Sequence, residues 1–82
     1  METKNRIKNV LVTLLKIKPE ELKDGISLQD SIGVDSTEMV ETVIALEKEF
    51  GTKLSAKEVT KFNTIEQITN TINSKLTNSK LK

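Results

Sequence analysis

The 82-residue sequence contains no cysteine, histidine, tryptophan or tyrosine. Without cysteine, the chain can form neither a disulfide nor a thiolate metal site. Without histidine, it lacks the base of a Ser–His–Asp triad and a principal nitrogen ligand of zinc. These absences argue against both an independent enzyme and a zinc protein.

Glycine is scarce as well, with three residues in the whole chain. Gly33 is the only one close to the serine considered below, Ser36, so no glycine-rich loop can cradle a nucleotide phosphate there. Asp30 and Asp35 do not follow the spacing of an EF-hand calcium loop. The sequence therefore predicts no metal site.

Aromatic residues are limited to Phe50 and Phe62, both of which we place in the core. Recognition of single-stranded nucleic acid by base stacking needs exposed aromatic rings. The basic residues are dispersed rather than clustered, so we expect no nucleic-acid partner.

Long apolar runs are also missing. No segment approaches the length of a membrane span, and no signal-peptide core follows Met1. We expect a cytoplasmic monomer with one domain over residues 1–82, of which about 78–82 form a frayed tail.

The net charge of +1 conceals an uneven distribution. Residues 20–49 hold nine acidic and two basic side chains, whereas the rest of the chain holds three acidic and eleven basic ones. The acidic half is centred on Ser36. A basic partner would be steered there even though the whole molecule is nearly neutral.

Apolar residues recur at helical spacing in three segments, which predicts an all-α fold. The first helix covers about Thr3 to Lys16, the second about Ser36 to Phe50, and the last opens with the capping box Thr64–Gln67. A second capping box, Ser55–Glu58, predicts a short helix to about Lys61. We thus expect a small four-helix bundle of three main helices and one short one. Its core should include the following residues: Met39, Val43, Leu46, Phe50, Ile65, Ile68 and Ile72.

A long connection, roughly Lys18 to Asp35, joins the first two main helices. Connections of this length are unusual in a compact domain unless they are packed or functional. Its apolar residues are spaced to fix it to the core as an ordered loop: Leu22, Ile26, Leu28, Ile32 and Val34. Glu20 and Glu21 suit a short helical turn.

This loop leads to Gly33-Val34-Asp35-Ser36, where the second main helix begins. Asp35 is the predicted N-cap, and Glu38, three residues later, completes a capping box. The hydroxyl of Ser36 is then free to face water beside the positive end of the helix dipole, which favours a phosphate. An Asp-Ser pair by itself most often indicates only a helix cap.

The context adds a family resemblance. The attachment motif Gly33-Val34-Asp35-Ser36 is followed by an acidic amphipathic helix up to Phe50, in a histidine-free helical chain. In these features the sequence resembles the acyl carrier proteins over nearly its whole length.

The resemblance implies that a phosphopantetheinyl transferase attaches the 4′-phosphopantetheine of coenzyme A to Ser36, and that Asp35 beside it belongs to the cofactor-binding site. The thiol of the arm would carry acyl groups as thioesters between acyl-transfer and synthase enzymes of fatty-acid or polyketide-type biosynthesis. Basic patches on these partners would dock on the second helix, and the carried-over docking residues are Thr37, Glu38, Val40, Glu41, Ile44 and Glu47. Val40 and Ile44 either complete the core or form an exposed apolar strip.

Two alternatives stay open. The usual leucine after the serine is Thr37 here, and the chain lacks the strong acidity of fatty-acid carriers, which favours a specialised pathway such as aminoacyl or D-alanyl transfer. A protein of another class, an unmodified helical adaptor, would use the acidic helix without Ser36.

Overall fold

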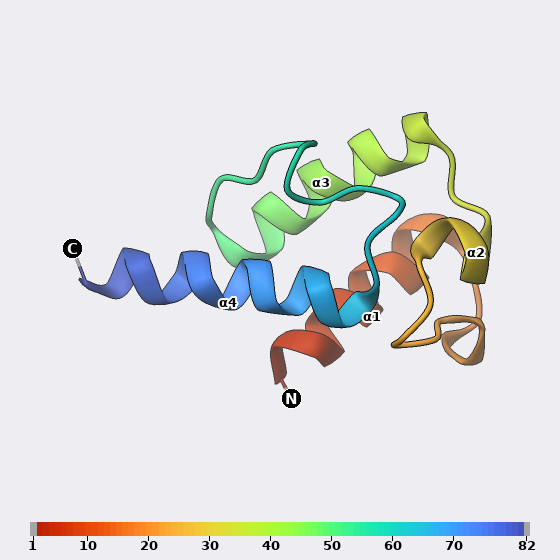
Figure 1. Ribbon diagram of the computed structural model, residues 1–82, viewed down its shortest axis with the longest axis horizontal. Helices are drawn as coiled ribbons and strands as arrows, with labels where there is room; N and C mark the ends of the chain where they lie inside the picture. The colour runs from red at the N-terminus through yellow and green to blue at the C-terminus, as the bar shows by residue number, and fades with distance from the viewer. Residues whose placement is uncertain (1, 82) are drawn as a thin grey trace.

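The computed structural model describes the backbone of residues 2–81 and the side chains of residues 3–76. These residues contain four α-helices and one short 3-10 helix, joined by turns and connections, with no strand among them (Figure 1). The elements are α1 (Glu2–Leu15), η1 (Pro19–Glu21), α2 (Leu28–Ile32), α3 (Ser36–Phe50) and α4 (Ile65–Leu81). The predicted all-α class is confirmed.

The core forms where α1 packs against both α3 and α4. Each main helix contributes a stripe of buried residues at helical spacing, which lies on the face toward the core. The stripes comprise Ile7 and Leu11 of α1; Met39, Val43, Leu46 and Phe50 of α3; and Ile65, Ile68 and Ile72 of α4. The predicted core residues of α3 and α4 are all buried.

Local backbone signals set the helix ends. α1 ends at Leu15, one residue earlier than predicted, because Lys16 adopts a left-handed conformation with φ of 56°. At the end of α3, Gly51 has φ of 64° and donates its N–H to the carbonyl of Glu47 at 2.8 Å. The box that opens α4 has both its bonds, from Gln67 N to Thr64 Oγ1 and from Thr64 N to Gln67 Oε1.

The end of α4 lies beyond the apolar periodicity, which stops at Leu76. The helix continues through Leu81. The predicted tail, 78–82, therefore coincides with the last turn of α4 and with Lys82, which lies outside the described residues.

The predicted short helix at 55–61 is wrong: these residues form turns. Ser55 Oγ donates to Glu58 Oε2 at 3.1 Å instead of accepting from the backbone, and Lys75 of α4 pairs with the same carboxylate at 2.7 Å. The N–H groups of Glu58 and Val59 both donate to the carbonyl of Ser55, which closes a single turn. Because only Val59 is buried here, no apolar stripe extends that turn into a helix.

The short helix of the bundle is instead α2, within the long connection. Ser27 caps its start by accepting from Asp30 N at 3.2 Å, and Gly33 ends it with φ of 69°. The connection is fixed to the core by buried Leu22, Leu28 and Val34, and Ile32 is partly buried against it. Ile26 departs from the prediction, since it is 42% exposed. The expected turn at Glu20 and Glu21 is the 3-10 helix η1.

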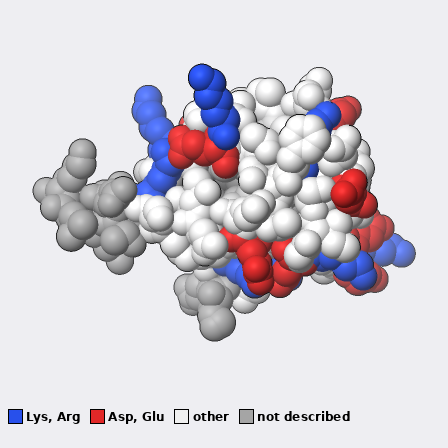
Figure 2. Space-filling view, viewed as in Figure 1, with Lys and Arg blue, Asp and Glu red and all other residues white. Residues whose placement is uncertain are grey.

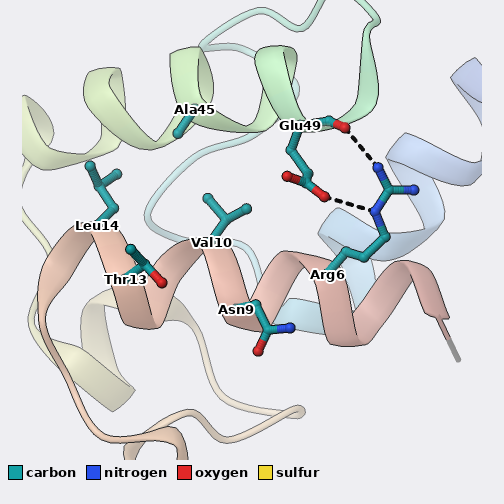
Figure 3. A pocket seen from close by; sticks show the side chains of 7 residues that line it. All are labelled: Arg6, Asn9, Val10, Thr13, Leu14, Ala45 and Glu49. Atoms are coloured by element: carbon teal, nitrogen blue, oxygen red, sulfur yellow. Dashed lines mark hydrogen bonds and ion pairs between the residues drawn. The ribbon is translucent and has the colours of Figure 1, made fainter.

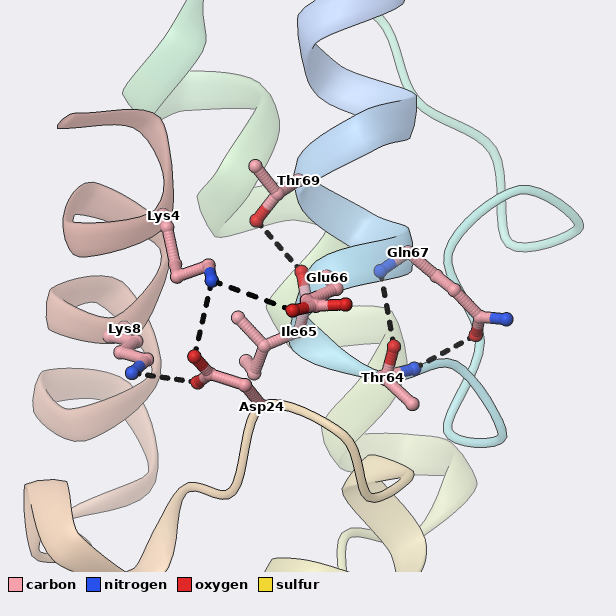
Figure 4. Close-up of polar contacts among 8 residues, drawn as sticks. All are labelled: Lys4, Lys8, Asp24, Thr64, Ile65, Glu66, Gln67 and Thr69. Atoms are coloured by element: carbon pink, nitrogen blue, oxygen red, sulfur yellow. Dashed lines mark hydrogen bonds and ion pairs between the residues drawn. The ribbon is translucent and has the colours of Figure 1, made fainter. Parts of the chain in front are cut away.

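A charged cluster joins this connection to α1, and one of its lysines also joins α1 to α4 (Figure 4). The carboxylate of Asp24 lies 2.8 Å from Lys8 Nζ and 3.1 Å from Lys4 Nζ, both on α1. Lys4 also lies 3.9 Å from Glu66 of α4. Hydrogen bonds from Lys8 and then Lys4 lower the pKa of Asp24, against the opposing effect of desolvation.

We predict that Asp24→Asn lowers the free energy of unfolding at pH 7 by about 1 kcal/mol or less, because these ion pairs are partly solvated. The folded-state pKa of Asp24 lies below its ordinary value of 3.8. The ion pairs therefore stabilise the fold above that value, and their contribution is lost as the pH falls through the folded pKa.

Urea unfolding between pH 7 and pH 3 measures this difference, which should shrink toward the acid end. Glu41→Gln removes a charge from an exposed position and is the matched control. A wild-type advantage that stayed constant down to pH 3 would contradict the ion-pair explanation.

Candidate functional site

The start of α3 presents Ser36 to solvent. Gly33 turns the chain in the left-handed region, and Val34, 3% exposed, anchors the next residue in the core. Asp35 then caps α3: its Oδ1 accepts from Glu38 N at 2.8 Å, and Glu38 Oε1 accepts from Asp35 N at 3.1 Å. The predicted capping box is therefore confirmed, and the exposed side chain of Ser36 takes no part in it.

The two carboxylates of the box leave other helix donors unused. Asp35 Oδ1 binds the N–H of Glu38, and the carbonyl of Asp35 accepts from Met39 N at 2.9 Å. Among the described residues, no hydrogen bond uses the N–H of Ser36 or of Thr37. These donors and the helix dipole suit a phosphate oxygen attached to the serine.

A small recess opens directly beside the serine. Its volume is about 230 Å³, and Ser36 lies on its wall. The other lining residues are Met39 and Val40 of α3 and Ala56, Val59, Thr60, Lys61 and Phe62 of the following connection. The recess therefore has one helical wall and one wall made by the segment in which no helix formed.

Hydrogen bonds from α2 hold the second wall in place. Leu28 N donates to the carbonyl of Asn63 at 3.0 Å, and Gln29 N donates to the carbonyl of Lys61 at 2.9 Å. These are first-turn amides of α2, which have no partners within their own helix. The short helix that leads to the serine thus also fixes the far side of the recess.

Phe62 stands between these two bonded carbonyls and is 67% exposed, so its predicted core position is wrong. The turn around it is closed by its own polar groups: Thr60 N donates to Asn63 Oδ1 at 2.7 Å, and Phe62 N donates to Thr60 Oγ1 at 3.2 Å. The turn therefore keeps the ring outside. The sequence carried one signal for this, since Phe62 lies outside the apolar periodicity and two residues before Thr64, the cap of α4.

The predicted docking residues lie mainly on the open face of α3. Thr37 and Glu41 are exposed, and Val40 and Ile44 are 53% and 47% exposed. Of the two alternatives for Val40 and Ile44, the structure therefore shows the exposed apolar strip, because these residues do not complete the core.

Two of the predicted acidic residues have structural partners. The carboxylate of Glu38 belongs to the capping box. Glu47 is half-buried and accepts from Leu54 N at 2.8 Å, so it stabilises the connection after α3. Glu41 accepts no hydrogen bond from any residue whose side chain is described.

Acidic and basic side chains both lie on the visible face of the molecule (Figure 2). Acidic side chains lie along the edge beside α2 and the start of α3, with basic ones among them, and basic side chains project over the connection between α3 and α4 beside acidic ones. The acidic edge matches the charge expected around Ser36.

A second groove, of about 380 Å³, lies between α1 and α3 (Figure 3). Arg6 closes one end by donating to the Glu49 carboxylate at 2.8 Å and to its carbonyl at 2.7 Å. Ala45 and Glu49 line it from a different flank of α3 than Val40. This groove shares no lining residue with the recess at the serine.

Comparison with known families matches residues 5–72 to the model described as phosphopantetheine attachment site. The match covers well over half of the chain. The chain belongs to this family. It is a carrier domain to which 4′-phosphopantetheine is covalently attached, consistent with the acyl carrier proteins. Domains of this kind are typically carriers without catalytic activity, and they interact with a phosphopantetheinyl transferase and with acyl-handling enzymes.

The residues at the start of α3 fit the group that this family carries. A phosphodiester needs an accessible hydroxyl, nearby hydrogen-bond donors and open space for the arm. Ser36 is exposed, free N–H groups lie beside it, and the recess adjoins it. Among the residues that the structure describes, no helix has the length and apolar character needed to cross a membrane, and no group of metal-ligating side chains is gathered.

The assignment of the cap to Asp35 predicts unequal effects of two neighbouring substitutions. Asp35→Ala should lower the free energy of unfolding by about 1 kcal/mol through the lost cap. Ser36→Ala should change it little, because the serine side chain makes no capping bond. Thermal unfolding of both variants tests the assignment, and a larger loss in Ser36→Ala would show that the serine is the true cap.

Proposed function

We propose that Ser36 is the attachment residue and that this carrier moves acyl groups as thioesters between enzymes of a fatty-acid or polyketide-type pathway. The supporting observation is the exposed hydroxyl at the start of α3, beside N–H groups that have no partner and beside an open recess.

Attachment would be a substitution at phosphorus, carried out by the transferase. Ser36 Oγ would bond to the phosphorus that bears the pantetheine, and the phosphoanhydride bond of coenzyme A would break. Adenosine 3′,5′-bisphosphate leaves, and the hydroxyl proton passes to a base of the transferase. When bound, the group supplies a terminal thiol that forms the thioester.

The residues of this chain then position the arm. Gly33 and Val34 hold the start of α3 on the surface, and the capping box keeps the Asp35 carboxylate turned to its own backbone. The N–H groups of Ser36 and Thr37 would face the phosphodiester oxygens. We propose no catalytic role for any residue of the chain.

A carrier of aminoacyl or D-alanyl groups is the second candidate, and the tight packing of the core favours it. The aliphatic residues that would have to part for a long chain, among them Leu46, Ile65 and Ile72, are fully buried. Sheltering a long acyl chain therefore requires opening a packed core, whereas a short cargo requires no change.

Incubation with coenzyme A and a broad-specificity phosphopantetheinyl transferase should add about 340 Da to the protein. Ser36→Ala should abolish the addition, whereas Ser55→Ala, which changes a partly buried serine elsewhere in the domain, should leave it intact. Intact-mass spectrometry measures both. An addition that survives Ser36→Ala would assign the arm to another residue, and a carrier isolated from its own cells would reveal its cargo as further mass.

For the docking face we propose that Glu41, with Thr37, Val40 and Ile44 around it, contacts the basic surfaces of partner enzymes. Glu38 and Glu47 would add to the local negative charge while keeping their structural bonds. Asp35 lies at the end of this face beside the attachment serine.

Glu41→Lys should lower kcat/KM of phosphopantetheine transfer up to about fivefold at low salt, since an exposed ion pair contributes about 1 kcal/mol or less. The loss should shrink above 0.5 M salt because screening weakens exposed charges. Glu20→Lys makes the same charge change on η1, away from the face, and is the control. Equal losses in both variants would contradict a localised docking face.

A further inference from the structure

The recess beside Ser36 combines an exposed ring and a cation that the fold does not use. Phe62 is 67% exposed in a turn whose polar groups are bonded to one another and to α2. Exposure of so large an apolar side chain has a free-energy cost in water, and the closed turn holds the ring outside the core. The ring is therefore available to an apolar group that enters the recess.

The cation is Lys61, whose Nζ lies 5.6 Å from the centre of the Phe62 ring. Five ion pairs join described side chains, and Lys61 takes part in none of them. Lys61 lines the same recess as Ser36 and is the only charged residue among those that line it. It is thus suited to a negative group at the serine.

The order of chemical groups along the arm matches this arrangement. The phosphodiester would be joined directly to Ser36 Oγ, and a carbon bearing two methyl groups follows one methylene later. The phosphodiester, next to the serine, would lie near Lys61. The dimethyl carbon, next along the arm, would lie near Phe62 and Val40.

We propose that Lys61 and Phe62 form a resting site for the first part of the arm. Lys61 pairs with the phosphodiester, and Phe62 packs with Val40 on the dimethyl carbon. This inference rests on the proposed attachment at Ser36. The recess of about 230 Å³ holds only this part of the arm, so the thiol stays outside, within reach of partner enzymes.

The carboxylates of Asp35 and Glu38 lie at the same end of α3 and oppose an anion there. Each accepts a backbone N–H within the capping box, at 2.8 and 3.1 Å. Lys61 offsets this repulsion from the opposite wall of the recess. Loss of the Lys61 charge should therefore change the ³¹P resonance of the phosphodiester more than loss of a lysine elsewhere in the connection.

The experiment uses the arm-bearing protein, prepared with coenzyme A and transferase and verified by intact mass. In the wild type, the ring current of Phe62 should separate the two methyl ¹H resonances of the arm, with nuclear Overhauser contacts to the ring. Phe62→Ala should return both methyl resonances to their positions in free phosphopantetheine. Lys61→Gln should shift the ³¹P resonance and weaken the methyl contacts, whereas Lys57→Gln, an exposed lysine that does not line the recess, should change neither.

The outcomes separate the two proposals. A normal mass increase with free-like methyl resonances in the wild type would overturn the resting site alone. Equal ³¹P changes in Lys61→Gln and Lys57→Gln would overturn the role of Lys61. Absence of the mass increase, or an increase that persists in Ser36→Ala, would overturn the attachment at Ser36 and the resting site with it. Amide spectra of the variants confirm folding, which exposed Phe62 and Lys57 should not disturb.

Discussion

The site depends on the reciprocal hydrogen bonds between Asp35 and Glu38. They fix the first turn of α3 with two side chains and leave Ser36, between them, with an exposed side chain. Were the serine itself the cap, its hydroxyl would face the helix backbone and not solvent. Because Asp35 caps the helix and Ser36 does not, the hydroxyl of Ser36 can be accessible while the start of α3 stays stable.

A second constraint joins the two walls of the recess. The first amides of α2 donate to the carbonyls of Lys61 and Asn63, and α2 ends at Gly33, three residues before the serine. A five-residue helix has little stability of its own. Its donors are satisfied by a distant segment, so the approach to the serine and the turn that carries Phe62 depend on each other.

Much of this could be predicted from the sequence, because the determining interactions are local. The apolar stripes of the main helices, the caps at Asp35 and Thr64, and the helix-ending Gly51 each act within a few residues. The same local reasoning failed at 55–61. There a capping-box pattern was present, but its Glu58 pairs with Lys75, seventeen residues away.

Phe62 shows the other limit of sequence reasoning. Hydrophobicity predicts burial, yet the orientation of this ring is set by a closed turn and by hydrogen bonds from α2, which lies more than thirty residues earlier. Glu47 shows the same effect for charge, since its bond to Leu54 N forms only once Gly51 has turned the chain back. Such long-range contacts leave no periodic trace in the sequence.

The pairing of charges on the surface has a consequence that net charge does not express. Two acidic side chains of residues 20–49, Asp24 and Glu49, pair with cations of α1. Asp35, Glu38 and Glu41 take part in none of the ion pairs between described side chains. Uncompensated negative charge in a molecule of net charge +1 is therefore found at the start of α3, where it attracts positive groups despite the net balance.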